Sequence, residues 1–169
     1  HLQTRVHLNV SLSQLSETGF GEQVFERVVA AGVRPSQLCF EVSDTPALRR
    51  SDDLISALLR LRDLGFRVGI DGFGAGYAGL ASLKILSADY IKIDRSFIDN
   101  LVTDREDRVM VEAMIRVAHD LDRRVIATGV ESEAQVEVLQ QLGCDEIQGY
   151  VHSAAVDAAQ VPEILARVG

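Results

Sequence analysis

The stretch "YIKID", residues 90–94, favours one fold over another because its two faces differ in polarity. In a strand, Ile91 and Ile93 project to one side, while Lys92 and Asp94 project to the other. A strand of an open parallel sheet is covered by helices on both faces and is apolar on both. In a closed barrel, only the outer face meets helices, and the inner faces converge on one axis. The polar face of this strand therefore favours a barrel.

The same kind of segment recurs along the chain, and helical patterns separate its copies. Period-two or β-rich patterns predict six strands, at 5–11, 38–43, 67–71, 90–94, 124–128 and 145–149. Helices are predicted at 21–32, about 46–64, a short stretch after Tyr77, about 104–121, 132–142 and 159–168. Strands that alternate with helices are typical of an α/β fold with a parallel sheet.

Polar side chains stand at or near the carboxyl end of every predicted strand. They are Asn9, Glu41, Asp71, Lys92 with Asp94, Thr128 and Gln148. Where the alternation is clear they oppose the apolar positions, such as Leu8 and Phe40, as the inner face of a barrel requires. A (β/α)8 barrel needs eight strands and roughly 250 residues. The sequence therefore predicts a TIM-like (β/α)8 barrel whose first two βα units are missing, with residues 1–169 forming a single partial domain.

A partial barrel leaves two sheet edges without a neighbouring strand. Unpaired edges and an open core favour pairing with other chains. We therefore expect the isolated chain to be poorly soluble, or to be completed by further residues of its own protein or by a partner.

The composition excludes several classes of protein. The net charge of −8 argues against nucleic-acid binding, which relies on basic surfaces. No window approaches the roughly 18 apolar residues of a membrane helix, and no signal peptide is recognisable. Cys39 and Cys144 lie far apart within apolar runs, which predicts buried, reduced thiols rather than a disulfide or a zinc site. A cytoplasmic domain is expected.

The polar strand ends predict a site for a hard cation. Oxygen ligands from Asn9, Glu41 and Asp71 would converge from three strands, which suits Mg²⁺, Mn²⁺ or Ca²⁺. Either carboxylate alone is more often a helix cap or a solvated loop residue, so the prediction depends on their convergence. Two such ions can hold the attacking and leaving oxygens of a phosphodiester.

Two further strand-end side chains, Lys92 and Gln148, each have two interpretations. Lys92 can orient a water or stabilise a transferring phosphate, or it can form a buried ion pair with Asp71 or Asp94. Gln148 can contact a ligand or a metal-bound water, or it can bond to nearby backbone. The histidines have no partners at metal-ligand spacing and are interpreted as structural or surface residues; they include His7, His119 and His152.

These motifs, in this order, resemble the EAL domain of bacterial cyclic di-GMP signalling. The resemblance rests on "LNVSLSQL" (8–15), "FEVSD" (40–44), "IDGFGAGYAGL" (70–80), "YIKIDRSFI" (90–98), "VIATGVES" (125–132) and "IQGY" (147–150). EAL domains are modified (β/α)8 barrels, and active members hydrolyse cyclic di-GMP to linear pGpG with two Mg²⁺ or Mn²⁺ ions. The resemblance also implies a possible homodimer and a GGDEF or sensory domain in the same protein.

Transferred by motif, the resemblance assigns a role to each strand-end residue. Asn9, Glu41 and Asp71 would bind metal, and Lys92 would act on the attacking water. The remaining positions would support the site or orient water and ligand; they are Asp94, Glu131 and Gln148.

Two of the departures from the family pattern remove carboxylates of the metal site. Gly72 replaces an aspartate that helps to hold the second metal, and Thr128 replaces a glutamate on which active members rely. Because two ions need about four negative ligand charges, the loss of two carboxylates should weaken the second ion by orders of magnitude. We therefore expect a degenerate EAL domain that acts as a nucleotide receptor or interaction module. The alternatives are a weakly active phosphodiesterase and a scaffold that binds no nucleotide. Ca²⁺ could replace Mg²⁺ or Mn²⁺ at the metal site without supporting hydrolysis.

Overall fold

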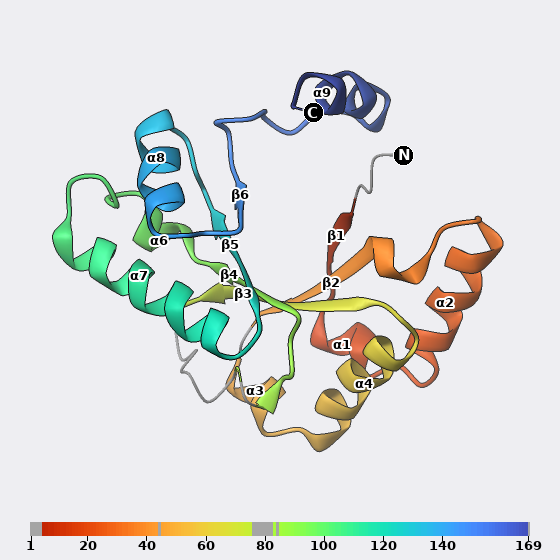
Figure 1. Cartoon of the computed structure of the whole chain (residues 1–169). Coiled ribbons are helices and arrows are strands. Elements are labelled where there is room, and N and C mark those ends of the chain that lie inside the picture. Colours follow the sequence, from red (N-terminus) through yellow and green to blue (C-terminus); the bar gives the residue numbers. More distant parts are fainter. Residues whose placement is uncertain (1–4, 44, 76–82, 84, 169) are drawn as a thin grey trace.

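The computed structural model describes residues 5–43, 45–75, 83 and 85–168, and its centre is a sheet of six parallel strands (Figure 1). The strand order follows the sequence: β1 (Val6–Asn9), β2 (Leu38–Ser43), β3 (Arg67–Phe73), β4 (Tyr90–Ile93), β5 (Arg124–Thr128) and β6 (Glu146–Gln148). All six predicted strands are present. A parallel sheet in sequential order, with β1 and β6 at its edges, is the arrangement of an incomplete α/β barrel.

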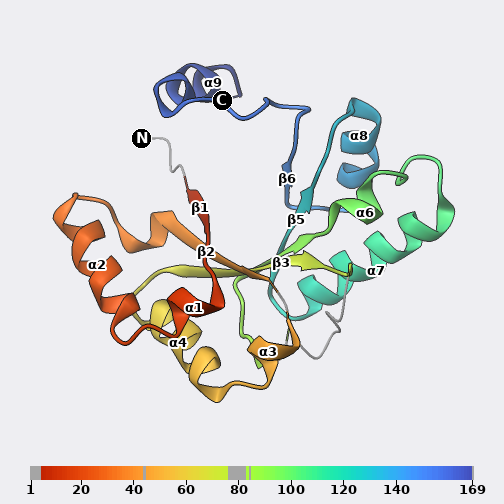
Figure 2. The same ribbon diagram turned by 180° about the vertical axis from the view of Figure 1, so that it is seen from behind.

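Helices connect the strands and cover the outside of the sheet. They are α1 (Leu12–Leu15), α2 (Phe20–Ala30), η1 (Pro35–Gln37), α3 (Pro46–Arg49), α4 (Asp52–Asp63), α6 (Arg95–Ile98), α7 (Arg105–Asp120), α8 (Glu133–Gln141), η2 (Ala158–Gln160) and α9 (Val161–Val168). Figures 1 and 2 show α2, α4, α7 and α8 around the outer side of the curved sheet, whereas α9 lies apart from them. The helix predicted after Tyr77 falls largely outside the described residues.

One predicted helix is divided in two. The expected helix over 46–64 consists of α3 and α4, because Ser51 begins a new helix by accepting a hydrogen bond from the Leu54 N–H at 3.3 Å. Similarly, β1 ends earlier than predicted because the Ser11 side chain caps α1. The sequence pattern also did not predict the short helices α1 and α6.

The core lies between the outer face of the sheet and the helices. Ile70, Ile91 and Ile93 from central strands are fully buried, together with Leu58 of α4 and Ile115 of α7. This packing confirms the predicted apolar face of β3 and β4.

At the edge strand the same pattern has a different outcome. Leu8, predicted on the helix-covered face, is 40% exposed, and Val6 is 49% exposed. β1 pairs with β2 on one side only in this structure, so fewer elements cover its outer face. The pattern gave the side to which Leu8 points but not its burial.

Two further expectations concern the cysteines and the membrane. Both cysteines are free thiols; Cys39 is buried and Cys144 is half-buried. Within the described part of the chain, no helix has the length and apolarity that crossing a bilayer requires.

Candidate active site

The carboxyl ends of the strands surround a cavity of about 330 Å³, here called the carboxyl-end cavity. Its lining consists of Asp71, Gly72, Lys92, Asp94, Arg95, Thr128, Gly129, Glu131, Gln148, Gly149 and Tyr150. The polar residues predicted on β3 to β6 therefore do converge. Asn9 and Glu41 are not among the lining residues.

Lys92 lies at the bottom of this cavity and bridges two carboxylates. Its side chain is 7% exposed, and Nζ lies 2.6 Å from Oε2 of Glu41 and 3.6 Å from Oδ1 of Asp71. A buried ammonium is stable only with such partners. The structure thus supports the ion-pair interpretation of Lys92 and adds Glu41 as the nearer partner.

Glu41 is enclosed by three side chains from other strands. Its Oε1 lies 2.7 Å from Nδ1 of His7 and accepts a hydrogen bond from the Tyr90 hydroxyl at 3.2 Å. The Tyr90 ring reaches this position across Gly69, where an added Cβ would lie 2.2 Å from the ring. The interpretation of His7 as a structural or surface residue therefore missed its contact with a predicted metal ligand.

These contacts determine the charges around Glu41. Burial alone would raise the pKa of Glu41, but the hydrogen bonds from His7 and Lys92 outweigh it and lower that pKa. Hydrogen bonds with Cys39 and Glu41 raise the pKa of His7 to about 9, against the effect of burial. Burial and the nearby Glu41 carboxylate raise the pKa of Tyr90. Glu41 is thus an anion between two protein cations, the ammonium of Lys92 and the imidazolium of His7.

Two of the predicted metal ligands, Glu41 and Asp71, are paired with Lys92. Asn9 lies opposite Glu41 in the β1–β2 register, and Asp71 lines the carboxyl-end cavity. Among the described residues, no three His, Cys, Asp or Glu side chains are grouped so that they could hold a metal ion. A divalent cation at Glu41 or Asp71 would also compete with the Lys92 ammonium for these carboxylates. The arrangement therefore does not fit a preassembled two-metal centre.

The two departures from the family pattern line the cavity and have defined environments. Gly72 has φ +71°, and an added Cβ would lie 3.8 Å from Oδ2 of Asp94, so an aspartate has room there. Aspartate also tolerates this left-handed conformation better than most residues. Thr128 donates its hydroxyl proton to the carbonyl of Ile93 at 2.7 Å. Thr128 therefore strengthens the contact between β4 and β5, whereas Gly72 contributes no polar side chain.

Asp94, Arg95 and Glu131 line the cavity together, and the sequence pattern gave no sign of a role for Arg95. Asp94 caps α6 by accepting a hydrogen bond from the Ser96 N–H at 2.9 Å. Arg95 lies 3.0 Å from Glu131 and 2.9 Å from Asp99. Its aliphatic part covers Gly129, where an added Cβ would lie 2.5 Å from Cγ. Glu131 is therefore already ion-paired within the protein.

Gln148 and Tyr150 form the β6 side of the cavity. The backbone carbonyl of Gln148 accepts a hydrogen bond from the Val130 N–H at 3.1 Å, while the side chain is exposed and lines the cavity. Gly149 between them approaches Val130 so closely that a Cβ would lie 2.0 Å from the Val130 carbonyl oxygen. Tyr150 is 68% exposed, so both side chains are available to a ligand.

The fold and the site define a parallel α/β barrel domain with its polar cavity at the carboxyl ends of the strands. Residues 1–155 match the family model of the EAL domain. The chain therefore belongs to the EAL domain family, whose named members act in bacterial cyclic di-GMP signalling.

Curated relatives agree with this assignment. The chain is 35% identical over 161 residues to the bifunctional diguanylate cyclase/cyclic di-GMP phosphodiesterase MucR of Pseudomonas aeruginosa, covering 95% of this chain and 24% of MucR. It is 34% identical to the cyclic di-GMP phosphodiesterase NbdA of the same organism, covering 98% of this chain and 21% of NbdA. The chain thus spans about a quarter or less of these relatives.

Solved structures show the same fold. The EAL domain of Mycobacterium smegmatis DcpA superposes with a TM-score of 0.90 at 32% identity, covering 96% of this chain and 73% of that one. The cyclic di-GMP complex of the MucR phosphodiesterase gives a TM-score of 0.84 at 35% identity, covering 93% and 64%. Klebsiella pneumoniae BlrP1, in a complex with manganese and cyclic di-GMP, gives 0.85 at 29% identity, covering 90% and 39%. The six-stranded sheet is therefore part of an EAL barrel.

Proposed function

We propose that this domain binds cyclic di-GMP in the carboxyl-end cavity and hydrolyses it slowly or not at all, so that it acts as a receptor or interaction module. The observation that carries the proposal is the charge balance of the cavity. Lys92 is paired with Glu41 and Asp71, and Arg95 is paired with Glu131. Gly72 and Thr128 add no carboxylate that would attract a second ion.

The roles of the individual residues follow from this balance. Asp71 is a partly exposed carboxylate that could hold one Mg²⁺ or Mn²⁺ ion, or a Ca²⁺ ion that does not support hydrolysis. Asn9 and Glu41 would be further ligands after Lys92 moves. Arg95 and Lys92 are the cations that could face the phosphates of the nucleotide. Gln148 supplies an amide at the opposite wall.

The experiment is a calorimetric titration of cyclic di-GMP with Mg²⁺, Mn²⁺ or Ca²⁺ present, followed by chromatography for pGpG. It should use the whole protein that contains this chain, so that further residues can complete the barrel. Binding without product is the expected result. Rapid formation of pGpG would contradict the loss of the second ion, and no binding would leave only the scaffold function.

The second candidate is a weak cyclic di-GMP phosphodiesterase. It is favoured by the convergence of Asp71, Lys92, Asp94 and Gln148 in one cavity, and by relatives that are named phosphodiesterases. The hydrolysis rate of the unmodified protein distinguishes the two candidates, and the Gly72→Asp and Thr128→Glu substitutions test whether the rest of the site can support hydrolysis.

The surrounding protein is part of the same proposal. We infer that the domain belongs to a longer cytoplasmic signalling protein with a GGDEF or sensory domain, and that it can form an EAL homodimer. The support is that the chain covers only a fraction of its relatives, one of which is named a bifunctional cyclase and phosphodiesterase. Size-exclusion chromatography with light scattering, applied to the whole protein, measures its oligomeric state.

A further inference from the structure

A second polar cavity lies at the amino ends of the strands, opposite the carboxyl-end cavity. This amino-end cavity has a volume of about 80 Å³ and is lined by Arg5, Arg34, Ser36, Gln37 and Arg67. Arg5 directly precedes β1, Arg67 begins β3, and the other three come from the segment that leads into β2. No aspartate or glutamate is among its lining residues in the part of the chain that the structure describes.

Three converging guanidinium groups are unexpected in this protein. The chain has 25 acidic residues against 17 lysines and arginines, so most arginines could find a carboxylate nearby. Like charges that converge without an anion repel one another and reduce stability. A carboxylate or an external anion between them would offset this repulsion.

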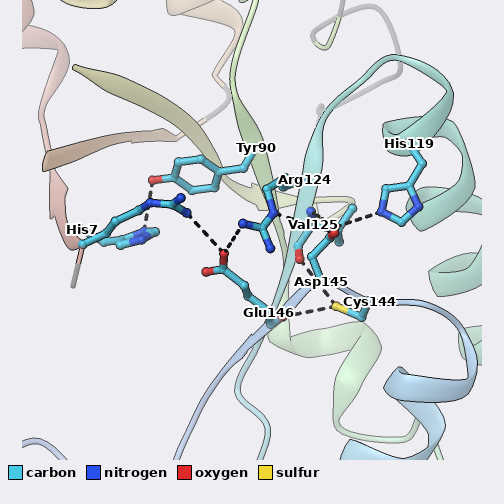
Figure 3. Close-up of polar contacts among 9 residues, drawn as sticks. His7, Tyr90, His119, Arg124, Val125, Cys144, Asp145 and Glu146 are labelled. Atoms are coloured by element: carbon cyan, nitrogen blue, oxygen red, sulfur yellow. Dashed lines mark hydrogen bonds and ion pairs between the residues drawn. The ribbon is translucent and has the colours of Figure 1, made fainter. Parts of the chain in front are cut away.

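The nearby carboxylates are already engaged elsewhere. Asp89 accepts a hydrogen bond from the Val68 N–H at 2.9 Å and lies 3.4 Å from Arg62. Figure 3 shows Glu146 beside Arg124, at 3.0 Å, whereas its distance to Arg5 is 3.6 Å. Arg5 is therefore paired with Glu146, which it shares with Arg124, whereas Arg34 and Arg67 have no ion pair with a carboxylate among the described residues.

Figure 3 also shows that Asp145 is directed to other partners. It lies 2.9 Å from His119 and accepts a hydrogen bond from the Val125 N–H at 2.8 Å. The contact of His119 with Asp145 agrees with a surface role for this histidine, whose side chain is 41% exposed. Asp145 is thus not available to the amino-end cavity.

Arg67 has a buried hydrogen-bond donor without an acceptor in the part of the chain that the structure describes. Its Nε is buried and has no hydrogen-bond partner among the described residues. A buried donor without an acceptor costs about 1–3 kcal/mol, more for a charged group. Arg34, in contrast, is exposed and donates from Nε to the Gln37 side chain at 3.3 Å, so its terminal nitrogens remain for another acceptor.

We propose that the amino-end cavity binds a small tetrahedral oxyanion, namely inorganic phosphate or the terminal phosphate of a phosphomonoester. Guanidinium groups bind such oxygens through paired, charge-assisted hydrogen bonds, and Ser36 and Gln37 add neutral donors. The cavity volume of about 80 Å³ is closer to the size of one phosphate group than to that of a whole nucleotide. This site is independent of the nucleotide cavity proposed above.

The test is the thermal unfolding midpoint of the protein at increasing phosphate and constant ionic strength, with a chelator present so that metal ions do not bind phosphate. Three substitutions are compared with the unmodified protein: Arg67→Gln, Arg34→Gln and the control Arg27→Gln, which removes an exposed arginine of α2. Arg34 is exposed, so its variant keeps the test valid even if Arg67→Gln fails to fold.

The expected result is a saturable rise of the midpoint in the unmodified protein and in Arg27→Gln. In Arg34→Gln and Arg67→Gln, half-saturation should need at least about tenfold more phosphate, since each loses charge-assisted hydrogen bonds. A rise that is not saturable and is equal in all four proteins would overturn the proposal, because excluded phosphate stabilises any protein in that way. No rise at all would overturn it as well, because the cavity would then hold no phosphate.

A second arm identifies the source of the phosphate group. Glycerol phosphate replaces inorganic phosphate at the same ionic strength. An equal, arginine-dependent shift indicates that the site accepts the terminal group of a larger molecule, whereas a shift with inorganic phosphate alone limits the ligand to the free ion. If neither compound shifts the midpoint in an arginine-dependent manner, the proposal fails.

Discussion

The two ends of the sheet interior both carry cations, but the protein's own carboxylates neutralise them to different extents. At the carboxyl end, Lys92 lies between Glu41 and Asp71, and its side chain is nearly inaccessible to solvent. At the amino end, Arg5, Arg34 and Arg67 line a cavity without a carboxylate among its described lining residues. The two ends therefore differ in how much cationic charge the protein's own carboxylates leave for an external anion.

The removal of the Lys92 ammonium should leave the carboxylates at the carboxyl end without their cation. We expect this substitution to have the largest effect on stability. Lys92→Met leaves the buried Glu41 with His7 as its only cationic partner among the described residues, and we expect the free energy of unfolding to fall by about 3–5 kcal/mol. Urea unfolding measures the change. The double variant Glu41→Gln/Lys92→Met should recover part of the loss, because it also removes the unpaired charge. A loss below about 1 kcal/mol would mean that the ion pair behaves like an exposed one.

The addition of two carboxylates at the carboxyl end should restore metal-dependent hydrolysis of cyclic di-GMP. Gly72→Asp combined with Thr128→Glu is expected to raise pGpG formation at least about 100-fold with Mg²⁺ or Mn²⁺, because two ligand charges return. Chromatography of the reaction with cyclic di-GMP measures the rate. Thr128→Val is the control, since it removes only the hydrogen bond to the Ile93 carbonyl. An unchanged rate in the double variant would locate the defect elsewhere in the site.

Gly69→Ala tests the close contact between Gly69 of β3 and the Tyr90 ring of β4. An added Cβ would lie 2.2 Å from the Tyr90 ring, and the ring must move away from Glu41 to avoid it. Overpacking of this kind reduces stability by about 1–3 kcal/mol. Thermal or urea unfolding detects the loss, and a second substitution, Tyr90→Val, should relieve it. If the double variant is as unstable as the single one, the contact with the ring is not the cause.

The smallest expected effect is on the pH dependence of stability. The pKa of His7 is raised from 6.5 to about 9 in the folded protein. Its contribution is therefore complete below about pH 6.5 and is lost as the pH rises toward 9. Urea unfolding with a chelator present should show a slope in this range of up to about 1 kcal/mol per pH unit, and a smaller slope in His7→Gln. Equal slopes in both proteins would contradict the pairing with Glu41. Because the pKa of Glu41 is lowered, its own contribution is present above its ordinary value and is lost in acid.

Much of the fold follows from local sequence patterns. The alternation in "YIKID" predicted a buried apolar face and an inward Lys92, and the structure has both. Helix boundaries were predicted to within a few residues where cap residues such as Asp104 and Ser132 precede an apolar period. The convergence of Asp71, Lys92 and Gln148 also follows from sequence, since parallel strands place their carboxyl ends at one edge.

Only the tertiary structure decided which groups are partners. Lys92 and Glu41 are 51 residues apart, and Tyr90 and His7 are 83 residues apart, so no local pattern could indicate these contacts. The exposure of Leu8 and the convergence of Arg5, Arg34 and Arg67 likewise depend on neighbouring segments of the fold. The sequence by itself determined the strands, their faces and the polar strand ends, because these depend on the local period of the chain. The tertiary structure determined which charges are neutralised, because neutralisation depends on distances between segments that are far apart in the sequence.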